Sequence, residues 1–299
     1  METVTFNGWK CLRLANDEVE VVVTRDVGPR VIRFGYTGAA NLFREMPGQQ
    51  GGRGEAEWMI RGGHRFWVAP EAKPWSYELD NVPYAAAEAI AGGVRVRQEA
   101  GSVTGLAKEI AITLAPDRNE VTLVHTLTNA GTAAVECAPW APTVMNRNGQ
   151  AVIPLPVRIP HTERLTHNQT WSIWGYTAFN DPRWTFGSRY LFFRQDPARG
   201  PNKLGIAHRG KWVAYQLDGF LFVKRFDHFD GQRYPDDGCS FETFANEDFL
   251  ELESLGPLTV LKPGGSVSHT ERWQLFRDVP RCADDADVER HILPLVAGR

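Results

Sequence analysis

The sequence predicts an all-β protein in which antiparallel strands form one large domain over residues 1–299, with a short helix at the C-terminus. Three observations support this class. Apolar and polar residues alternate with a period of two in about fifteen segments. Turn residues, mainly Gly, Pro, Asn and Asp, separate these segments. No segments of helical periodicity lie between them, as an alternating α/β fold would require. We therefore expect two stacked β-sheets.

The individual elements follow from this alternation. The main candidate strands are Val19–Thr24, Arg30–Phe34, Gly93–Gln98, Lys108–Leu114, Val121–Leu127, Tyr190–Arg194, Leu204–His208, Trp212–Leu217, Phe220–Lys224, Phe249–Glu253, Leu258–Leu261 and Val267–Phe276. Asp218-Gly219 lies between two of them and is the two-residue turn typical of a tight hairpin. Only Asp284–Leu293 has helical character, with acidic residues at its start.

Length and composition describe an ordinary globular protein. The chain has 299 residues, of which 42% are hydrophobic and 23% charged, so it can bury a large core without disulfides or metals. The net charge is −3 and no long basic run is present, which disfavours a nucleic-acid partner. The apolar stretches are far shorter than the roughly 20 residues of a membrane span. We therefore expect neither nucleic acid nor a membrane as a partner.

Cysteine usage and the N-terminus bear on the compartment. The four cysteines form no CxxC pair, so neither a zinc site nor a disulfide framework is indicated. Met1–Phe6 lacks the basic-then-apolar layout of a signal peptide. These features predict a cytoplasmic protein. Its expected oligomeric state, a monomer or a homodimer, does not follow from them.

No standard cofactor motif is present, and neither a cofactor nor a metal is expected. A group of acids near the end of the chain lacks the spacing of a calcium loop and is expected to form a solvated acidic rim. Its members are Asp236, Asp237, Glu242, Glu247 and Asp248.

The segment Arg61–Glu71 is the first that carries chemistry. Two glycines allow a sharp turn or a close approach to a ligand, and His64, Arg65 and Trp67 follow them. An imidazole, a guanidinium and an indole can transfer a proton, clamp a hydroxyl or carboxylate, and stack on a ring. The alternative is a turn in which His64 bonds a carbonyl and Trp67 joins the core.

The segment Phe249–Pro257 is the second. On an alternating strand, Glu251 and Glu253 share one face. That face is either a solvated surface or the lining of a groove. Beside apolar groups the pKa of such a carboxylate would rise toward neutrality, as a general base requires.

Aromatic residues and histidines give weaker signals. Ten tryptophans are many for this length and are typical of proteins that stack on sugar rings, although aromatic residues also fill β-sandwich cores. Trp171 and Trp174 form a cluster that could contribute to a sugar platform. His125 shares its strand face with apolar residues, which favours a core or groove histidine over a metal ligand.

A series of motifs along nearly the whole chain resembles the galactose mutarotase-like superfamily, and within it the DUF4380-type branch. The motifs are Val27–Ile32, Asn41–Phe43, Gly62–Glu71, Ala138–Met145, Leu250–Pro257, Leu261–Gly265 and Glu271–Trp273. The resemblance implies a β-supersandwich with a sugar groove across one concave sheet. Aldose 1-epimerases of that fold use a carboxylate as base on the anomeric hydroxyl and a histidine as acid on the ring oxygen.

Site residues carried over from this resemblance are expectations. Glu253 matches the base, and His64 and Arg65 match the histidine and arginine that face the ring oxygen and the hydroxyls. The other groove residues are Trp67, Glu71, His125, Trp140, Trp174 and Lys224. One departure is clear, because Ala138–Thr143 has no histidine where the family has its second one. Either another group, such as His125 or Lys224, replaces it, or the epimerase chemistry is lost.

The leading functional hypothesis is therefore acid/base interconversion of sugar anomers in a tryptophan-lined groove, acting on a monosaccharide or a short oligosaccharide. The alternatives are a non-catalytic carbohydrate-binding or sensing module, and a glycoside lyase or hydrolase on the same scaffold.

Overall fold

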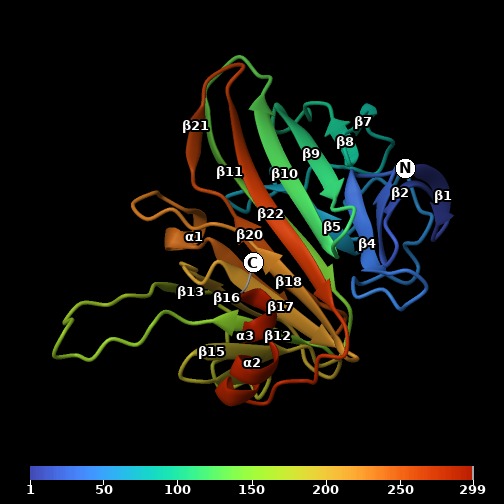
Figure 1. Cartoon of the computed structure of the whole chain (residues 1–299). Helices are drawn as coiled ribbons and strands as arrows, with labels where there is room; N and C mark the ends of the chain where they lie inside the picture. Colours follow the sequence, from blue (N-terminus) through green and yellow to red (C-terminus); the bar gives the residue numbers. More distant parts are fainter. Residues whose placement is uncertain (298–299) are drawn as a thin grey trace.

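Two antiparallel sheets stacked face to face make up the computed structural model, which describes residues 1–297 (Figure 1). The alternating segments fold as expected, and the all-β class with a short C-terminal helix is confirmed. Hairpin connections dominate, among them the predicted turn at Asp218-Gly219, which joins Leu217 to its partner Phe220.

The first sheet has twelve strands. Its path in space runs through β1 (Glu2–Phe6), β2 (Trp9–Ala15), β3 (Val19–Thr24), β4 (Arg30–Tyr36), β5 (Gly63–Arg65), β11 (Val135–Met145), β20 (Leu250–Leu255), β19 (Phe241–Ala245), β16 (Asn202–Ile206) and β13 (Trp171–Ile173). Two further strands, β6 (Trp67–Ala69) and β21 (Thr259–Leu261), also pair with β11. β11 therefore pairs with β5, β6, β20 and β21 and lies at the centre of this sheet.

The second sheet has ten strands. In spatial order they are β14 (Trp184–Phe186), β15 (Tyr190–Arg194), β12 (Gln150–Pro154), β17 (Trp212–Leu217), β18 (Phe220–Arg225), β22 (Ser266–Phe276), β10 (Glu120–Asn129), β9 (Leu106–Leu114), β8 (Gly93–Gln98) and β7 (Ala86–Ile90). The expected strand Leu204–His208 begins and ends two residues earlier, as β16.

Helices are few and short. The predicted C-terminal helix is α2 (Asp285–His291), which α3 (Leu293–Val296) follows. The side chain of Asp284 caps α2 by accepting a hydrogen bond from the backbone N–H of Asp287. A four-residue helix, α1 (Pro235–Gly238), was not expected from the sequence. None of the helices in residues 1–297 has the length and apolar character needed to cross a membrane.

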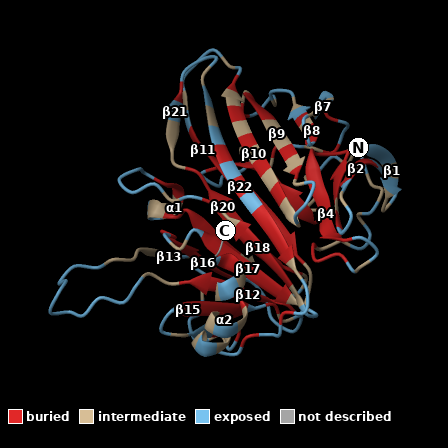
Figure 2. Cartoon of the chain, viewed as in Figure 1, coloured by how far each residue is buried: buried red, intermediate tan, exposed pale blue. Residues whose placement is uncertain are grey.

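The main core lies between the two sheets and draws residues from nearly the whole chain. Strand β10 alternates buried and half-buried residues, and much of β22 alternates buried and exposed ones, because their outer face meets solvent (Figure 2). Strand β20 is buried along its whole length, on both faces. Loop side chains such as Trp58 and Tyr77 cover the outer face of the first sheet here, where they pack against Trp67 and Trp140. This covered outer face carries the candidate site.

Candidate active site

A cavity of about 260 Å³ opens on the outer face of the first sheet, above β5, β11, β16 and β20. Its walls are unusually rich in aromatic and charged side chains. The lining residues are Trp58, Ile60, Arg65, Trp67, Glu71, Tyr77, Trp140, Tyr176, Lys203, Phe244, Asn246, Phe249, Glu251 and Glu253. The structure thus brings together five of the residues expected from the sequence: Arg65, Trp67, Glu71, Trp140 and Glu253.

Strand alternation places the two glutamates of β20 in this cavity. Glu251 and Glu253 point outward to the cavity, whereas Leu250 and Leu252 point inward to the main core. Of the two interpretations of these carboxylates, the structure therefore favours a groove lining over a solvated surface.

Glu253 lies at the base of the cavity and is only 1% exposed. Its Oε2 accepts hydrogen bonds from Trp140 Nε1 at 3.0 Å and from Lys203 Nζ at 3.3 Å. Its Oε1 is buried and has no hydrogen-bond partner among the described residues. Burial raises the pKa of Glu253 to about 7, with Lys203 opposing the rise and Glu251 adding to it. A carboxylate with these properties can exchange a proton near neutral pH.

Lys203 is the cation nearest to Glu253, and sequence analysis missed it. Its ammonium lies 2.6 Å from Glu242 Oε2 and lies over the rings of Trp140 and Trp174, at 5.2 and 4.6 Å. Burial alone would lower the pKa of Lys203, but Glu253 and Glu242 raise it well above its ordinary value. The alternation in Lys203-Leu204-Gly205-Ile206 places Lys203 opposite an apolar face, and that signal could have revealed it.

Glu242 was expected in a solvated acidic rim, but the structure places it in the interior. It is 1% exposed, lies directly opposite Glu253 in the pairing of β19 with β20, and contacts Lys203. Burial raises its pKa well above the usual range of a glutamate, and Glu253 adds to the rise while Lys203 opposes it. The other members of the group are half-buried or exposed, so only Glu242 departs from that expectation.

Arg65 and the aromatic rings form the side of the cavity. Arg65 NH1 donates to Glu251 Oε1 at 2.7 Å, and the guanidinium lies 4.1 Å above the ring of Trp67. The buried Nε of Arg65 has no partner among the described residues. Glu71 accepts a hydrogen bond from the hydroxyl of Tyr77 at 2.5 Å. Fixed donors and acceptors thus surround an aromatic hollow.

His64 lies on the opposite face of the sheet, so the expected face-to-face pair of Glu253 and His64 does not form. Neighbouring residues on a strand point to opposite faces. Because Arg65 faces the cavity, His64 faces the core, where it is fully buried and bonds Thr143 Oγ1 at 2.9 Å. Burial lowers its pKa well below the ordinary value, which keeps the ring neutral.

His125 and Lys224 lie in the same interior and do not line the cavity. His125 Nε2 lies 2.8 Å from His64 Nε2, and burial lowers the pKa of His125 to about 3. Lys224 bonds Glu271 at 2.8 Å and donates to the carbonyls of Ala141 and Leu252. The structure thus provides no contact through which either residue could replace the missing family histidine.

The ligand atoms of His64, His125 and Glu271 lie within 4.8 Å of one another, close enough in principle to hold a metal ion. The donor set does not fit this role. Both oxygens of Glu271 already accept hydrogen bonds, and Lys224 supplies the positive charge beside it. The cluster is a satisfied buried polar network.

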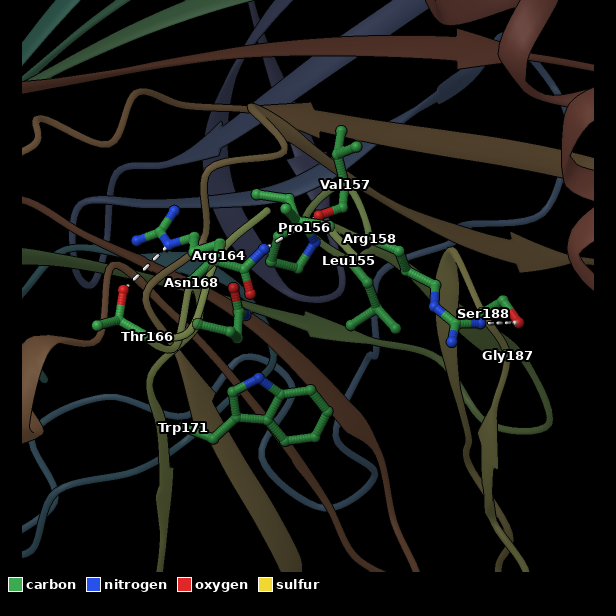
Figure 3. Close-up of a pocket in the computed structure, with 12 residues that line it drawn as sticks. Leu155, Pro156, Val157, Arg158, Arg164, Thr166, Asn168, Trp171, Gly187 and Ser188 are labelled. Atoms are coloured by element: carbon green, nitrogen blue, oxygen red, sulfur yellow. Dashed lines mark hydrogen bonds between the residues drawn. The ribbon is translucent and has the colours of Figure 1, made fainter. Parts of the chain in front are cut away.

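A second cavity, of about 430 Å³, lies between the long loop 155–170 and the turn at Gly187-Ser188 (Figure 3). Trp171 forms one side of it, and Arg158 and Arg164 contact Ser188 and Thr166. None of its described lining residues is a carboxylate, histidine or lysine. It therefore lacks the proton-transfer groups of the Glu253 cavity.

Trp174 was expected in the sugar groove. It contacts Lys203 but does not itself line the Glu253 cavity.

Comparison with known proteins assigns the fold. No family model matches the chain, and no curated protein matches its sequence. A galactose mutarotase-like protein from Lactobacillus casei superposes with a TM-score of 0.62 at 8% identity, over 89% of this chain and all of that one. The Slr1438 protein from Synechocystis gives 0.60 at 11%, over 93% of this chain and all of that one.

A galactose mutarotase related enzyme from Lactobacillus acidophilus gives a TM-score of 0.56 at 9% identity, over 90% of this chain and 98% of that one. The chain therefore has the galactose mutarotase-like fold, as the motifs predicted. At these identities the likeness describes the fold alone.

Proposed function

We propose that the protein is an aldose 1-epimerase-like enzyme that interconverts the α and β anomers of a monosaccharide. The observation that carries this proposal is Glu253, a buried carboxylate with one free oxygen and a pKa near 7, at the base of an aromatic cavity. In the reaction Glu253 accepts the proton of the anomeric hydroxyl. The ring oxygen takes up a proton as its bond to C1 breaks, and rotation about the C1–C2 bond then lets the ring close on the other face of C1.

Size and lining suit a single sugar ring. At about 260 Å³ the cavity lies just below the range of about 300–1,000 Å³ typical of drug-sized ligands. Among the aromatic residues that line the cavity, the more exposed Trp58 and Tyr176 offer apolar surface for the C–H side of a pyranose, while Arg65, Glu71 and Glu251 offer polar atoms for its hydroxyls. We therefore propose a monosaccharide, or the terminal unit of a short oligosaccharide, as the ligand.

The charges favour a neutral sugar over a phosphorylated or uronic one. Both cations that line the cavity are already paired, Arg65 with Glu251 and Lys203 with Glu242. Glu71 adds a further carboxylate, whose one described side-chain donor is the hydroxyl of Tyr77. An anionic substrate would have to displace an existing carboxylate from its cation, at an electrostatic cost.

Anomer exchange measured by saturation-transfer NMR on glucose and galactose tests the proposal. We expect exchange faster than in buffer, and a loss of on the order of 10²–10⁴-fold in Glu253→Gln, because an amide cannot accept the proton. Sugar affinity should stay within about tenfold of the wild type, since the amide keeps the shape and hydrogen-bonding capacity of the side chain.

Glu99→Gln, the same chemical change at an exposed position, is the matched control and should leave the exchange unchanged. Sugar binding without any acceleration of exchange would contradict the enzyme and support a carbohydrate-binding module.

The narrower expectations belong to the same proposal. The DUF4380-type branch rests on the ordered motifs alone. A cytoplasmic location is supported by the four cysteines, all of which are free and buried, as is usual in a reducing compartment.

A further inference from the structure

Ring opening needs a proton donor at the ring oxygen, and the cavity contains no histidine among its described lining residues. We infer that Lys203 donates this proton and that Glu242, behind it, returns a proton to Lys203. The inference rests on the proposed anomer exchange and adds to it an acid in place of His64, which the resemblance suggested and which lies buried in the core.

Other donors in the cavity are poorly placed for this step. The guanidinium of Arg65 is paired with Glu251, and arginine is not a general acid in proteins. The hydroxyl of Tyr77 is committed to Glu71. Tyr176 is about half exposed, and no hydrogen bond to another described residue fixes the position of its hydroxyl. Lys203 remains, a nearly buried ammonium that lines the cavity beside Glu253.

Three adjacent strands fix the arrangement. β16 carries Lys203, β19 carries Glu242 and β20 carries Glu253, and these strands are neighbours in that order. Glu242 and Glu253 are direct cross-strand partners, and the ammonium contacts both, at 2.6 and 3.3 Å. Because regular strands hold all three groups, their spacing does not depend on a flexible loop.

Two buried carboxylates with a single ammonium between them hold one surplus proton. Full ionisation would leave an uncompensated negative charge in a medium of low polarity, which is costly. Burial raises the pKa of Glu242 well above its usual range, and that of Glu253 to about 7. The charges of Glu251 and Glu71 also raise the pKa of Glu253, and that of Arg65 lowers it. Asp236 adds to the raised pKa of Glu242. The surplus proton therefore resides on Glu242 when Glu253 is in its basic form.

Protons and bonds balance in both directions. Glu253 accepts the proton of the hydroxyl on C1, a C1=O bond forms, and the bond from C1 to the ring oxygen breaks. The ring oxygen accepts a proton from the Lys203 ammonium, and Lys203 regains one from the Glu242 carboxyl. Closure on the other face of C1 reverses each transfer, so the enzyme ends in its initial state.

Chemical rescue distinguishes an acid from a structural lysine. We expect Lys203→Ala to lower the exchange rate by on the order of 10²–10⁴-fold. Added primary alkylammonium ions should raise the exchange rate of this variant at least tenfold, and the rescued rate should depend on the pKa of the amine. A purely structural lysine would give no such dependence. Lys10→Ala, at an exposed position, is the matched control.

Glu242→Gln tests the relay separately, because it keeps the shape of the side chain but removes the proton that it shares. The expected result is a displaced pH–rate profile, with sugar affinity and unfolding temperature close to those of the wild type. An unchanged profile contradicts the role of Glu242.

Full activity of Lys203→Ala alongside an inactive Glu253→Gln overturns the assignment of Lys203 and leaves the proposed function standing. An inactive wild type contradicts the proposed function itself.

Discussion

Glu253 combines reactivity with a cost to stability, and both have one physical cause. Its pKa is about 7 in the folded protein and near 4.5 when exposed in the unfolded chain, because burial disfavours the charged form. The folded state thus binds more protons between these values. The contribution that this extra proton binding makes to the stability of the folded state is fully present below pH 4.5 and is lost as the pH rises through 7.

Glu253→Gln should therefore gain stability relative to the wild type as the pH increases. We expect the difference in unfolding free energy to change in favour of the variant by on the order of 1–3 kcal/mol between pH 5 and 8. Urea unfolding at pH 5, 6, 7 and 8 measures this difference. A difference independent of pH would show that Glu253 has an ordinary pKa.

Sequence reasoning found several residues of the cavity because their chemistry and alternation were visible in short segments. Glu253 and Arg65, both named from the motifs, line the same cavity. The same reasoning placed His64 in the groove together with Arg65, although neighbouring residues on a strand point to opposite faces. Whether His64 or Arg65 points to the cavity depends on how β5 is placed in the first sheet. Long-range strand pairing sets that placement, and a short segment of sequence does not reveal it. Lys203 was missed for a related reason, since its carboxylate partners lie about 40 and 50 residues further along the chain.

At the scale of elements, alternation predicted strands well and their surroundings poorly. The expected segments Val19–Thr24, Gly93–Gln98 and Tyr190–Arg194 coincide with β3, β8 and β15. Strand β11 was not expected as a continuous strand, since Pro139 and Pro142 interrupt its pattern and prolines are rare in central strands. Pro142 has no N–H to offer, and it lies opposite Glu253 in the ladder.

Lys224 strengthens this part of the sheet from the core side. Lys224 lies on β18 of the second sheet, and its ammonium donates to the carbonyls of Ala141 on β11 and Leu252 on β20 of the first. It also pairs with Glu271 on β22 of its own sheet. We expect Lys224→Met to lower the unfolding free energy by about 3–5 kcal/mol, because Glu271 is left buried without its counter-ion.

The double variant Lys224→Met with Glu271→Gln should recover much of this loss, because neither charge then remains buried. Urea denaturation of the two single variants and the double variant gives the coupling energy. A loss below about 1 kcal/mol in Lys224→Met would show that this buried ion pair contributes little to the stability of the fold.

At the scale of the whole molecule, the order of strands argues for one cooperative unit. β11 lies between β5 and β20, and β22 lies between β18 and β10, so early and late segments of the chain alternate across both sheets. The main core likewise includes residues from Leu12 to Leu275. No single cut divides the chain into halves without splitting a sheet.

This interleaving predicts a single unfolding transition, although proteins beyond about 150 residues often populate intermediates. Differential scanning calorimetry should show one peak, with equal calorimetric and van 't Hoff enthalpies. Glu253→Gln and Lys224→Met should each move that peak without dividing it, because each site lies in strands that the whole fold shares. Two resolved peaks, or a calorimetric enthalpy well above the van 't Hoff value, would contradict the prediction of one domain over residues 1–299.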